Sequence, residues 1–197
     1  MPIRSVIAIL LRLMTFTAAA MALSLPTAAQ FEPKAEVAFE YNYVHSNAPP
    51  SGCGCFSMNG GGASGAIQLH GGLIAVAQFS AAHASNIARD DEDLTLTSYL
   101  VGPRYTYRTQ RRLAPFGEVL VGLSHASGGL SPSNAVSGAS SSVFAAAMGG
   151  SLDFNVGRRV GIRVVRADYL VTAFANRADD RQNDLRLGTG VAFYLGR

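Results

Sequence analysis

Apolar and polar positions alternate along most of this chain. The clearest case is residues 183–197, where every second position is apolar and most positions between are small or charged. A period of two residues is typical of a β-strand with two chemically different faces. The apolar face of this last strand contains Leu185, Leu187, Val191, Phe193 and Leu195.

Seven earlier stretches show the same alternation, so the sequence predicts eight strands. They are residues 34–44, 63–69, 73–81, 94–107, 115–126, 142–155, 160–171 and 183–197. In the stretch 94–107 apolar residues occur on both faces. We favour the register that turns Arg104 inward, and expect a β-bulge in this strand.

The connections between the predicted strands alternate between long and short. The long ones are residues 45–62, 82–93, 127–141 and 172–182, which are rich in residues that interrupt strands. Outer-membrane barrels have an even number of strands, short periplasmic turns and long external loops. With both termini in the periplasm, all four long connections would lie outside. The sequence therefore predicts an all-β fold, an eight-stranded antiparallel up-and-down transmembrane β-barrel.

Aromatic residues near both ends of the strands fit the same picture, because membrane barrels carry an aromatic girdle at each interface. Near the long connections these are Tyr41, Tyr43, Phe79, Phe144 and Tyr169, and near the short turns they are Tyr105, Tyr107, Phe154 and Phe193. A soluble secreted ligand-binding barrel would also alternate. It would need a well-charged outer face, whereas here the second face is mostly Gly, Ala, Ser and Thr.

The first 29 residues have the order of a secretory signal, with a charged start, an apolar middle and small residues before a cleavage point near Ala29. The alternative is a transmembrane anchor, but Arg12 interrupts the apolar run. We expect a signal peptide over residues 1–29 and a barrel domain over residues 30–197. Cleavage would leave 14 of the 16 basic residues against 13 acidic ones. Such a balance does not indicate a nucleic-acid partner.

The stretches 94–108, 115–127 and 185–196 resemble the small outer-membrane β-barrel family of the OmpA/OmpX type, over the whole predicted mature length. The chain end also resembles the assembly signal of such barrels, at Gly190, Phe193 and Leu195. The resemblance implies an integral protein of the bacterial outer membrane. Its implied partners are outer-membrane lipid, lipopolysaccharide and the barrel-assembly machinery, and it implies no cofactor.

Charged residues on the inner face are the first candidate site. Buried ions are costly unless they are paired, so mixed charges at similar depths predict a salt-bridge network that plugs the lumen. The alternative is a path for protons or ions. The candidates are Glu36, Glu40, Arg104, Glu118, Asp153, Arg166, Asp168 and Arg186.

A second candidate lies at the outer end of the fifth predicted strand, where His125 and Ser127 form a His-x-Ser step. A histidine that takes the proton of a nearby hydroxyl at the lipid boundary is what a lipid hydrolase needs. The arrangement resembles the lipid A deacylase barrels, where Asn follows Ser. Here Gly128 follows, and no acidic residue lies between Ser127 and Leu152. We favour a histidine and serine that solvate the barrel rim.

The first long connection contains Cys53 and Cys55, in a chain expected to reach an oxidising compartment. We favour a disulfide between them, with free thiols, a bridge to another chain and half of a metal site as alternatives. Acidic groups at positions 90–93 and 179–180 are expected to be solvated, although such clusters can also hold Ca²⁺. No motif indicates a metal centre or a cofactor.

These observations favour a non-enzymatic membrane barrel with a structural or surface-interaction role, exerted by its four long connections on an extracellular partner. The alternatives are an outer-membrane lipid hydrolase that uses His125 and Ser127, and a soluble secreted ligand-binding barrel.

Overall fold

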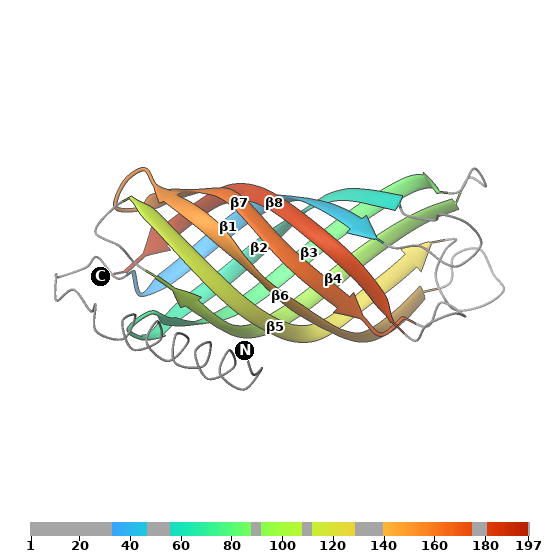
Figure 1. Cartoon of the computed structure of the whole chain (residues 1–197), viewed down its shortest axis with the longest axis horizontal. Helices are drawn as coiled ribbons and strands as arrows, with labels where there is room; N and C mark the ends of the chain where they lie inside the picture. Colours follow the sequence, from blue (N-terminus) through green and yellow to red (C-terminus); the bar gives the residue numbers. More distant parts are fainter. Residues whose placement is uncertain are drawn as a thin grey trace, which may run out of the picture. The chain divides into compact units, whose positions relative to one another are not determined.

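The computed structural model of this chain describes residues 33–46, 56–87, 92–107, 112–128, 140–174 and 181–196, and they form eight antiparallel strands (Figure 1). Each strand pairs with its neighbours in the sequence. The strands are β1 Ala35–Ser46, β2 Phe56–His70, β3 Leu73–Ile87, β4 Glu92–Thr106, β5 Leu113–Gly128, β6 Ser140–Asn155, β7 Val160–Thr172 and β8 Gln182–Leu195.

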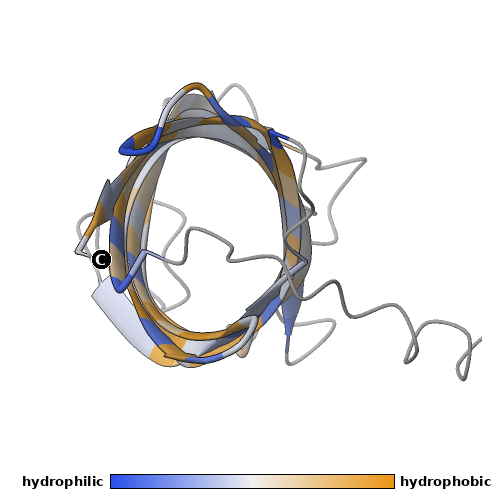
Figure 2. Ribbon diagram, turned by 90° about the vertical axis from the view of Figure 1, so that its left-hand side faces the viewer, coloured by the Kyte–Doolittle hydropathy of each residue, from blue (hydrophilic) through white to orange (hydrophobic). Residues whose placement is uncertain are grey.

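Pairing between β1 and β8 closes the sheet into a barrel, which Figure 2 shows end-on as one continuous ring. Closure leaves no strand edge unpaired, which is the condition for a sheet to span lipid. The predicted fold class and number of strands are therefore confirmed.

The apolar side of each strand faces outward. Phe39, Leu123 and Met148 are 57%, 57% and 64% exposed, whereas Ala38 and Leu120 on the opposite face are fully buried. In water such a surface would strongly favour aggregation, because so much of it is apolar. The exterior therefore fits a hydrocarbon environment. Within the described residues, no helix has the length and hydropathy needed to cross a membrane.

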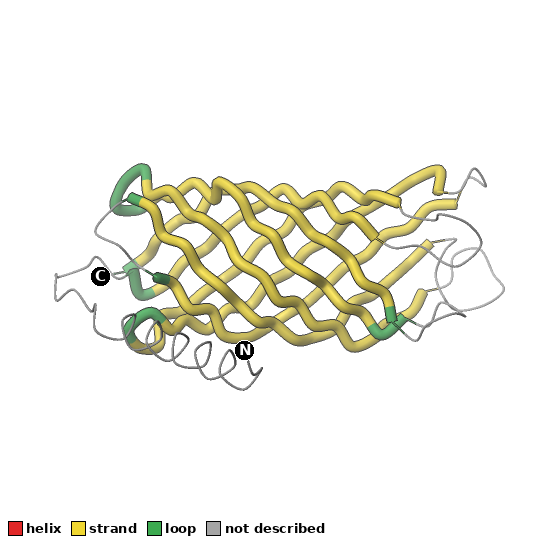
Figure 3. The backbone as a smooth tube through the Cα atoms, in the orientation of Figure 1, coloured by secondary structure: helices red, strands yellow, loops and turns green. Residues whose placement is uncertain are grey.

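The two ends of the barrel differ in the length of their connections. The short turns after β2, β4 and β6 lie together at one end, here called the inner end (Figure 3). The turn after β2 contains Gly71 at φ 54°, a backbone conformation that suits glycine. At the other end, called the outer end, β1, β3, β5 and β7 finish, and residues 47–55, 88–91, 129–139 and 175–180 connect the strands.

Two long connections are shorter than the sequence predicts, because the strands that flank them extend further. β2 begins at Phe56, so Gly60, Gly61 and Gly62 lie inside a strand and the prediction of a loop over 45–62 was wrong there. The glycines fit because the neighbouring strand approaches closely. A Cβ on Gly62 would lie 2.8 Å from the carbonyl oxygen of Phe79. Likewise β3 continues to Ile87 and β4 begins at Glu92, so of the predicted loop 82–93 only residues 88–91 lie between the two strands.

The register is irregular in other strands than the one expected. β4 pairs with β5 without a shift from Leu94 to Thr106, so no bulge occurs there, and Arg104 faces inward. Register shifts occur instead near the ends of β2 and β3 and in β7, where the shift lies between Arg163 and Arg166. Both intervening valines point outward, at 51% and 47% exposure, so the two arginines both point into the lumen.

Several predictions concern residues outside the described ranges. They are the signal peptide at residues 1–29, the cysteines Cys53 and Cys55, and the acidic residues Asp90, Asp91, Asp179 and Asp180.

Candidate functional site

The structure brings the predicted inward-facing ions together in the lumen. All eight side chains are buried, with residue exposures between 1% and 7%. They come from β1, β4, β5, β6, β7 and β8. These residues are Glu36, Glu40, Arg104, Glu118, Asp153, Arg166, Asp168 and Arg186.

A ninth ion, Arg163, joins this group and was missed by the sequence reasoning. It is fully buried and binds Asp153 through two hydrogen bonds, from Nε to Oδ1 at 2.9 Å and from Nη2 to Oδ2 at 3.0 Å. It also pairs with Glu36 at 3.0 Å and with Glu40. Strict alternation from Arg166, which faces inward, would place position 163 on the outer face of the strand. The run Arg-Val-Val-Arg, which puts two apolar residues between two cations, was the available signal for the bulge.

Arg104 and Arg166 connect strands on different sides of the barrel. Arg104 pairs with Glu36 at 2.8 Å and with Glu118 at 2.9 Å. Arg166 pairs with Asp168 at 2.7 Å, with Glu40 at 3.1 Å and with Glu118. β1 is not adjacent to β4 or β7 in the barrel, and β7 is not adjacent to β5. The pairs of Arg104 with Glu36, and of Arg166 with Glu40 and Glu118, therefore cross the lumen.

Arg186 ends the network on the side nearer the outer end. Its guanidinium binds Asp168 at 2.8 Å and donates hydrogen bonds to Gln78 Oε1 at 2.8 Å and to Ser80 Oγ at 3.1 Å. Arg186 therefore has partners on two strands, Gln78 and Ser80 on β3 and Asp168 on β7.

The network contains four guanidinium groups and five carboxylates, so it carries one excess negative charge. Phe116 supports it from the inner end, because the Arg104 guanidinium lies 4.0 Å from the ring centroid and that of Arg163 lies 4.8 Å away. Cations over an aromatic face gain further electrostatic stabilisation. Such multiply paired ions tolerate burial that a single ion would not.

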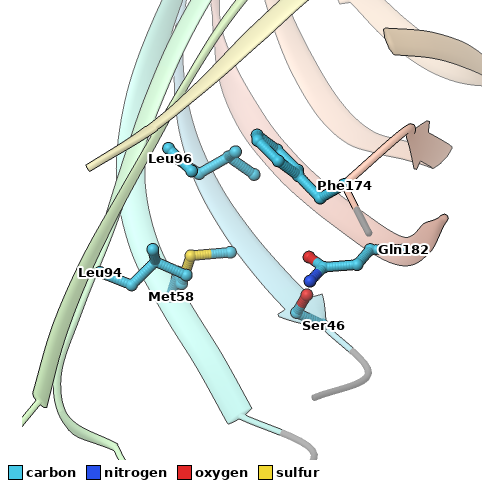
Figure 4. Close-up of a pocket in the computed structure, with 7 residues that line it drawn as sticks. Ser46, Met58, Leu94, Leu96, Phe174 and Gln182 are labelled. Atoms are coloured by element: carbon cyan, nitrogen blue, oxygen red, sulfur yellow. The ribbon is translucent and has the colours of Figure 1, made fainter. Parts of the chain in front are cut away.

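Most large side chains in the outer half of the lumen are apolar, although the polar residues Ser46, Thr172 and Asp184 are also buried there. Its largest buried side chains include Met58, Leu96 and Phe174, which belong to the principal hydrophobic cluster. They surround a cavity of about 20 Å³, with Ser46 and Gln182 opposite Leu96 (Figure 4). This volume is about that of one water molecule. This cavity therefore has room for one water molecule and not for a larger solute.

The His-x-Ser step lies on the outer surface near the outer end, and the structure gives the histidine a different partner. His125 Nδ1 lies 2.8 Å from Ser142 Oγ on β6. Ser127 lies one full strand repeat further along β5 and is in register with Ser140. Among the described residues, no group of three or more His, Cys, Asp and Glu is arranged to hold a metal ion.

The residues of the resembled assembly signal all lie in β8. Phe193 and Leu195 point outward, at 41% and 51% exposure. Phe193 makes an edge-to-face contact with Phe39 of β1, at 6.5 Å between ring centroids. Gly190 is in register with Glu40 across the seam that closes the barrel.

Comparison with known proteins gives one family and a consistent set of structures. The family model described as outer membrane protein beta-barrel domain matches residues 8–193. Neisserial surface protein A is similar in fold, with a TM-score of 0.63 and 15% identity over 82% of this chain and 97% of that one. Ail, the attachment invasion locus protein of Yersinia pestis, gives 0.51 and 20% over 81% and 99%. The search of curated proteins found no match.

Proposed function

The chain belongs to the outer membrane protein β-barrel domain family, and from that premise we propose that it is a closed scaffold that presents its outer connections to partners at the cell surface. As a member of this family it is an integral protein of the bacterial outer membrane. The proposal concerns what the barrel does there. The proposal has two parts: the lumen is sealed, and the outer end is exposed to partners.

The observation that carries the proposal is the set of ion pairs that cross the lumen. Arg104 joins β4 to β1, and Arg166 joins β7 to both β1 and β5. An eight-stranded barrel is just wide enough for its side chains to fill the interior. A solute that passed this level would have to separate several buried ion pairs. Each separation leaves uncompensated charge in a low-dielectric site, which costs several kcal/mol by general estimates.

The apolar outer half supports the same conclusion. Met58, Leu96 and Phe174 are at most 7% exposed, and they lie between the network and the outer end. A hydrated ion that entered from outside would have to shed water in this region before it reached the ion-pair network. Two successive barriers of different chemistry favour a sealed barrel over an ion path.

With the lumen sealed, the outer end is the part of the barrel best placed for interaction. Loops carried by a rigid scaffold are the usual site of recognition. We assign the surface-interaction role to the connections at the outer end, residues 47–55, 88–91, 129–139 and 175–180. The partner would be extracellular.

The sealed lumen is tested by conductance in planar lipid bilayers, with the protein extracted in detergent from outer membranes. We expect no stable current steps from protein that migrates faster unheated than boiled, which is the sign of a folded barrel. Reproducible steps of solute-pore size from such folded protein would refute the seal.

The presentation of the outer connections is tested separately on intact cells. An epitope inserted within residues 129–139 should be labelled by antibody without permeabilisation. The same epitope inserted at Gly157, in the short turn after β6, should be labelled only after the outer membrane is opened. The opposite pattern would show that the outer end faces the periplasm, and would end the proposal.

A further inference from the structure

Three of the four histidines lie on the outer surface near the outer end, and each is paired with a hydroxyl group on the next strand. In every pair the ring uses Nδ1. The distances are 3.2 Å from His45 to Ser57 Oγ, 2.9 Å from His83 to Thr95 Oγ1 and 2.8 Å from His125 to Ser142 Oγ.

The three pairs repeat the same arrangement. Each histidine lies on a strand that runs to the outer end, namely β1, β3 and β5, and each hydroxyl lies on the strand that returns. The hydroxyl orients the ring and occupies Nδ1, so Nε2 is the nitrogen that can meet a further group. In the pair of β1 and β2, the Tyr43 hydroxyl also lies 2.6 Å from Ser57 Oγ, which extends the set of polar groups.

The strand register places the three histidines at one height. A path can be followed from Val37 of β1 to its paired residue on β2, and so on from strand to strand, until it reaches Asn183 of β8. Asn183 lies one residue nearer the outer end than Asp184, and Asp184 is paired with Ser46 of β1. After one turn round the eight strands, the path therefore returns to β1 about ten residues nearer the outer end than it started, because the strands of a barrel are tilted. A level ring must step back by slightly more than one residue at each strand.

The histidines follow this step. His83 is in register with Asn59, two residues nearer the inner end than Ser57, the partner of His45. His125 is in register with Thr97, again two residues nearer the inner end than Thr95. This step of two residues toward the inner end over two strands nearly equals the shift toward the outer end that the strand tilt produces. The three rings therefore form a level belt over β1 to β6, here called the histidine belt.

The belt lies just outside the outer aromatic girdle. Tyr43 precedes His45 by two residues, and Tyr99 lies two residues below Thr97, with exposures of 38% and 57%. Tyrosines of membrane barrels mark the level where the hydrocarbon meets the polar headgroups. One strand repeat further out, the belt is at the level of the headgroups themselves.

We propose that the histidine belt binds the phosphate groups of lipopolysaccharide in the outer leaflet. Imidazole N–H and hydroxyl groups are donors, and phosphate oxygens are strong acceptors whose hydrogen bonds are charge-assisted. The direct cross-strand neighbours of the rings carry no charge: they are Ser57, Asn59, Thr95, Thr97, Ser142 and Leu185. No anion among these direct neighbours therefore competes with a phosphate group for the rings. Rings on alternate strands are separated by roughly 10 Å or more, twice the strand spacing, so they serve separate phosphate groups and do not share a metal ion.

The test is native mass spectrometry of the full chain, extracted in detergent and titrated with lipid A that carries two phosphates, with its dephosphorylated form and with phosphatidylglycerol. We expect the wild type to bind phosphorylated lipid A about tenfold more tightly than the dephosphorylated form. The triple variant His45→Gln/His83→Gln/His125→Gln should lose about this factor. His70→Gln is the matched control, because His70 lies at the inner end.

A second triple variant, Ser57→Ala/Thr95→Val/Ser142→Ala, keeps the imidazoles and removes the groups that orient them. We expect an intermediate loss of about threefold, because a freely rotating ring must be ordered on binding. If the histidine triple variant does not fold, as judged by heat-modifiable migration, the three single substitutions carry the same test with about a twofold loss each.

The proposal fails if the histidine triple variant binds phosphorylated lipid A as tightly as the wild type does. It also fails if the wild type binds the dephosphorylated form equally well, since phosphate would then not be recognised. Tighter binding of phosphatidylglycerol than of phosphorylated lipid A would likewise overturn the assignment to lipopolysaccharide.

Discussion

Substitution of Arg163 by methionine removes an arginine that binds three carboxylates in the lumen. Glu36 would retain Arg104, and Glu40 would retain Arg166. Asp153, at 2% exposure, would lose the cation that binds it through two hydrogen bonds. The excess charge of the network would rise from one to two negative units. The substitution therefore leaves a buried carboxylate without its counterion.

Breaking a buried ion pair by removing one partner costs about 3–5 kcal/mol. The lost contact with the Phe116 ring adds about 1 kcal/mol or less. We expect Arg163→Met to lower the free energy of unfolding by about 3–6 kcal/mol in total. The double variant Arg163→Met/Asp153→Asn should recover at least about 2 kcal/mol of this loss, because it removes the stranded charge.

The measurement is urea unfolding in lipid vesicles, followed by the mobility of unheated protein on gels and by far-ultraviolet circular dichroism, since the chain contains no tryptophan. Arg158→Met is the control, because Arg158 lies in an exposed turn. If Arg163→Met is no less stable than Arg158→Met, the ion pairs do not stabilise the barrel. If the double variant is less stable than Arg163→Met alone, the cost does not come from the unpaired carboxylate.

Three further predictions follow from particular contacts. Glu118→Ala should lower the free energy of unfolding by about 1–3 kcal/mol, which is less than for Arg163→Met, because it leaves four guanidinium groups against four carboxylates. It should lower the unfolding temperature without new conductance, and a large ion current would contradict the sealed lumen. Gly62→Ala should impair folding, measured as the yield of heat-modifiable protein, because its Cβ would lie 2.8 Å from the Phe79 carbonyl oxygen. Gly65→Ala is the control and should fold normally, because its Cβ would have nothing within 4 Å, and equal yields would refute the close approach. Expression of the chain should leave the mass of lipid A unchanged, and a loss of acyl chains that disappears in His125→Ala and in Ser127→Ala would establish the hydrolase instead.

The period of two residues predicted the fold because it depends on a physical demand that acts at every position, namely that one face meets lipid and the other meets side chains. The same rule placed Glu118 and Arg186 inward. It failed where the chain departs from strict alternation. The bulge between Arg163 and Arg166 changes the parity of β7, and Gly60, Gly61 and Gly62 lie in a strand although glycines more often interrupt one.

The partners of each ion could not be predicted from the sequence, because they depend on the tilt of the strands. Arg104 and Glu36 are 68 residues apart and lie on strands that are not adjacent. Their contact requires the stagger accumulated over the intervening strands. The level of the three histidines depends on the same quantity. Alternation gives the face of each residue, and only the closed register gives its height and its neighbours.

The two halves of the lumen depend on each other electrostatically. Met58, Leu96 and Phe174 keep water away from the outer side of the network, which lowers the local dielectric and strengthens each ion pair. The same low dielectric makes the excess negative charge more costly, which favours guanidinium groups shared between carboxylates: Arg163 binds three carboxylates and Arg166 also binds three. Sharing requires cations that reach several walls at once. A lysine in place of either arginine would keep the charge but lose the planar fork that holds several carboxylates together. The seal that we propose for the lumen therefore depends on the geometry of the arginines as much as on their charge.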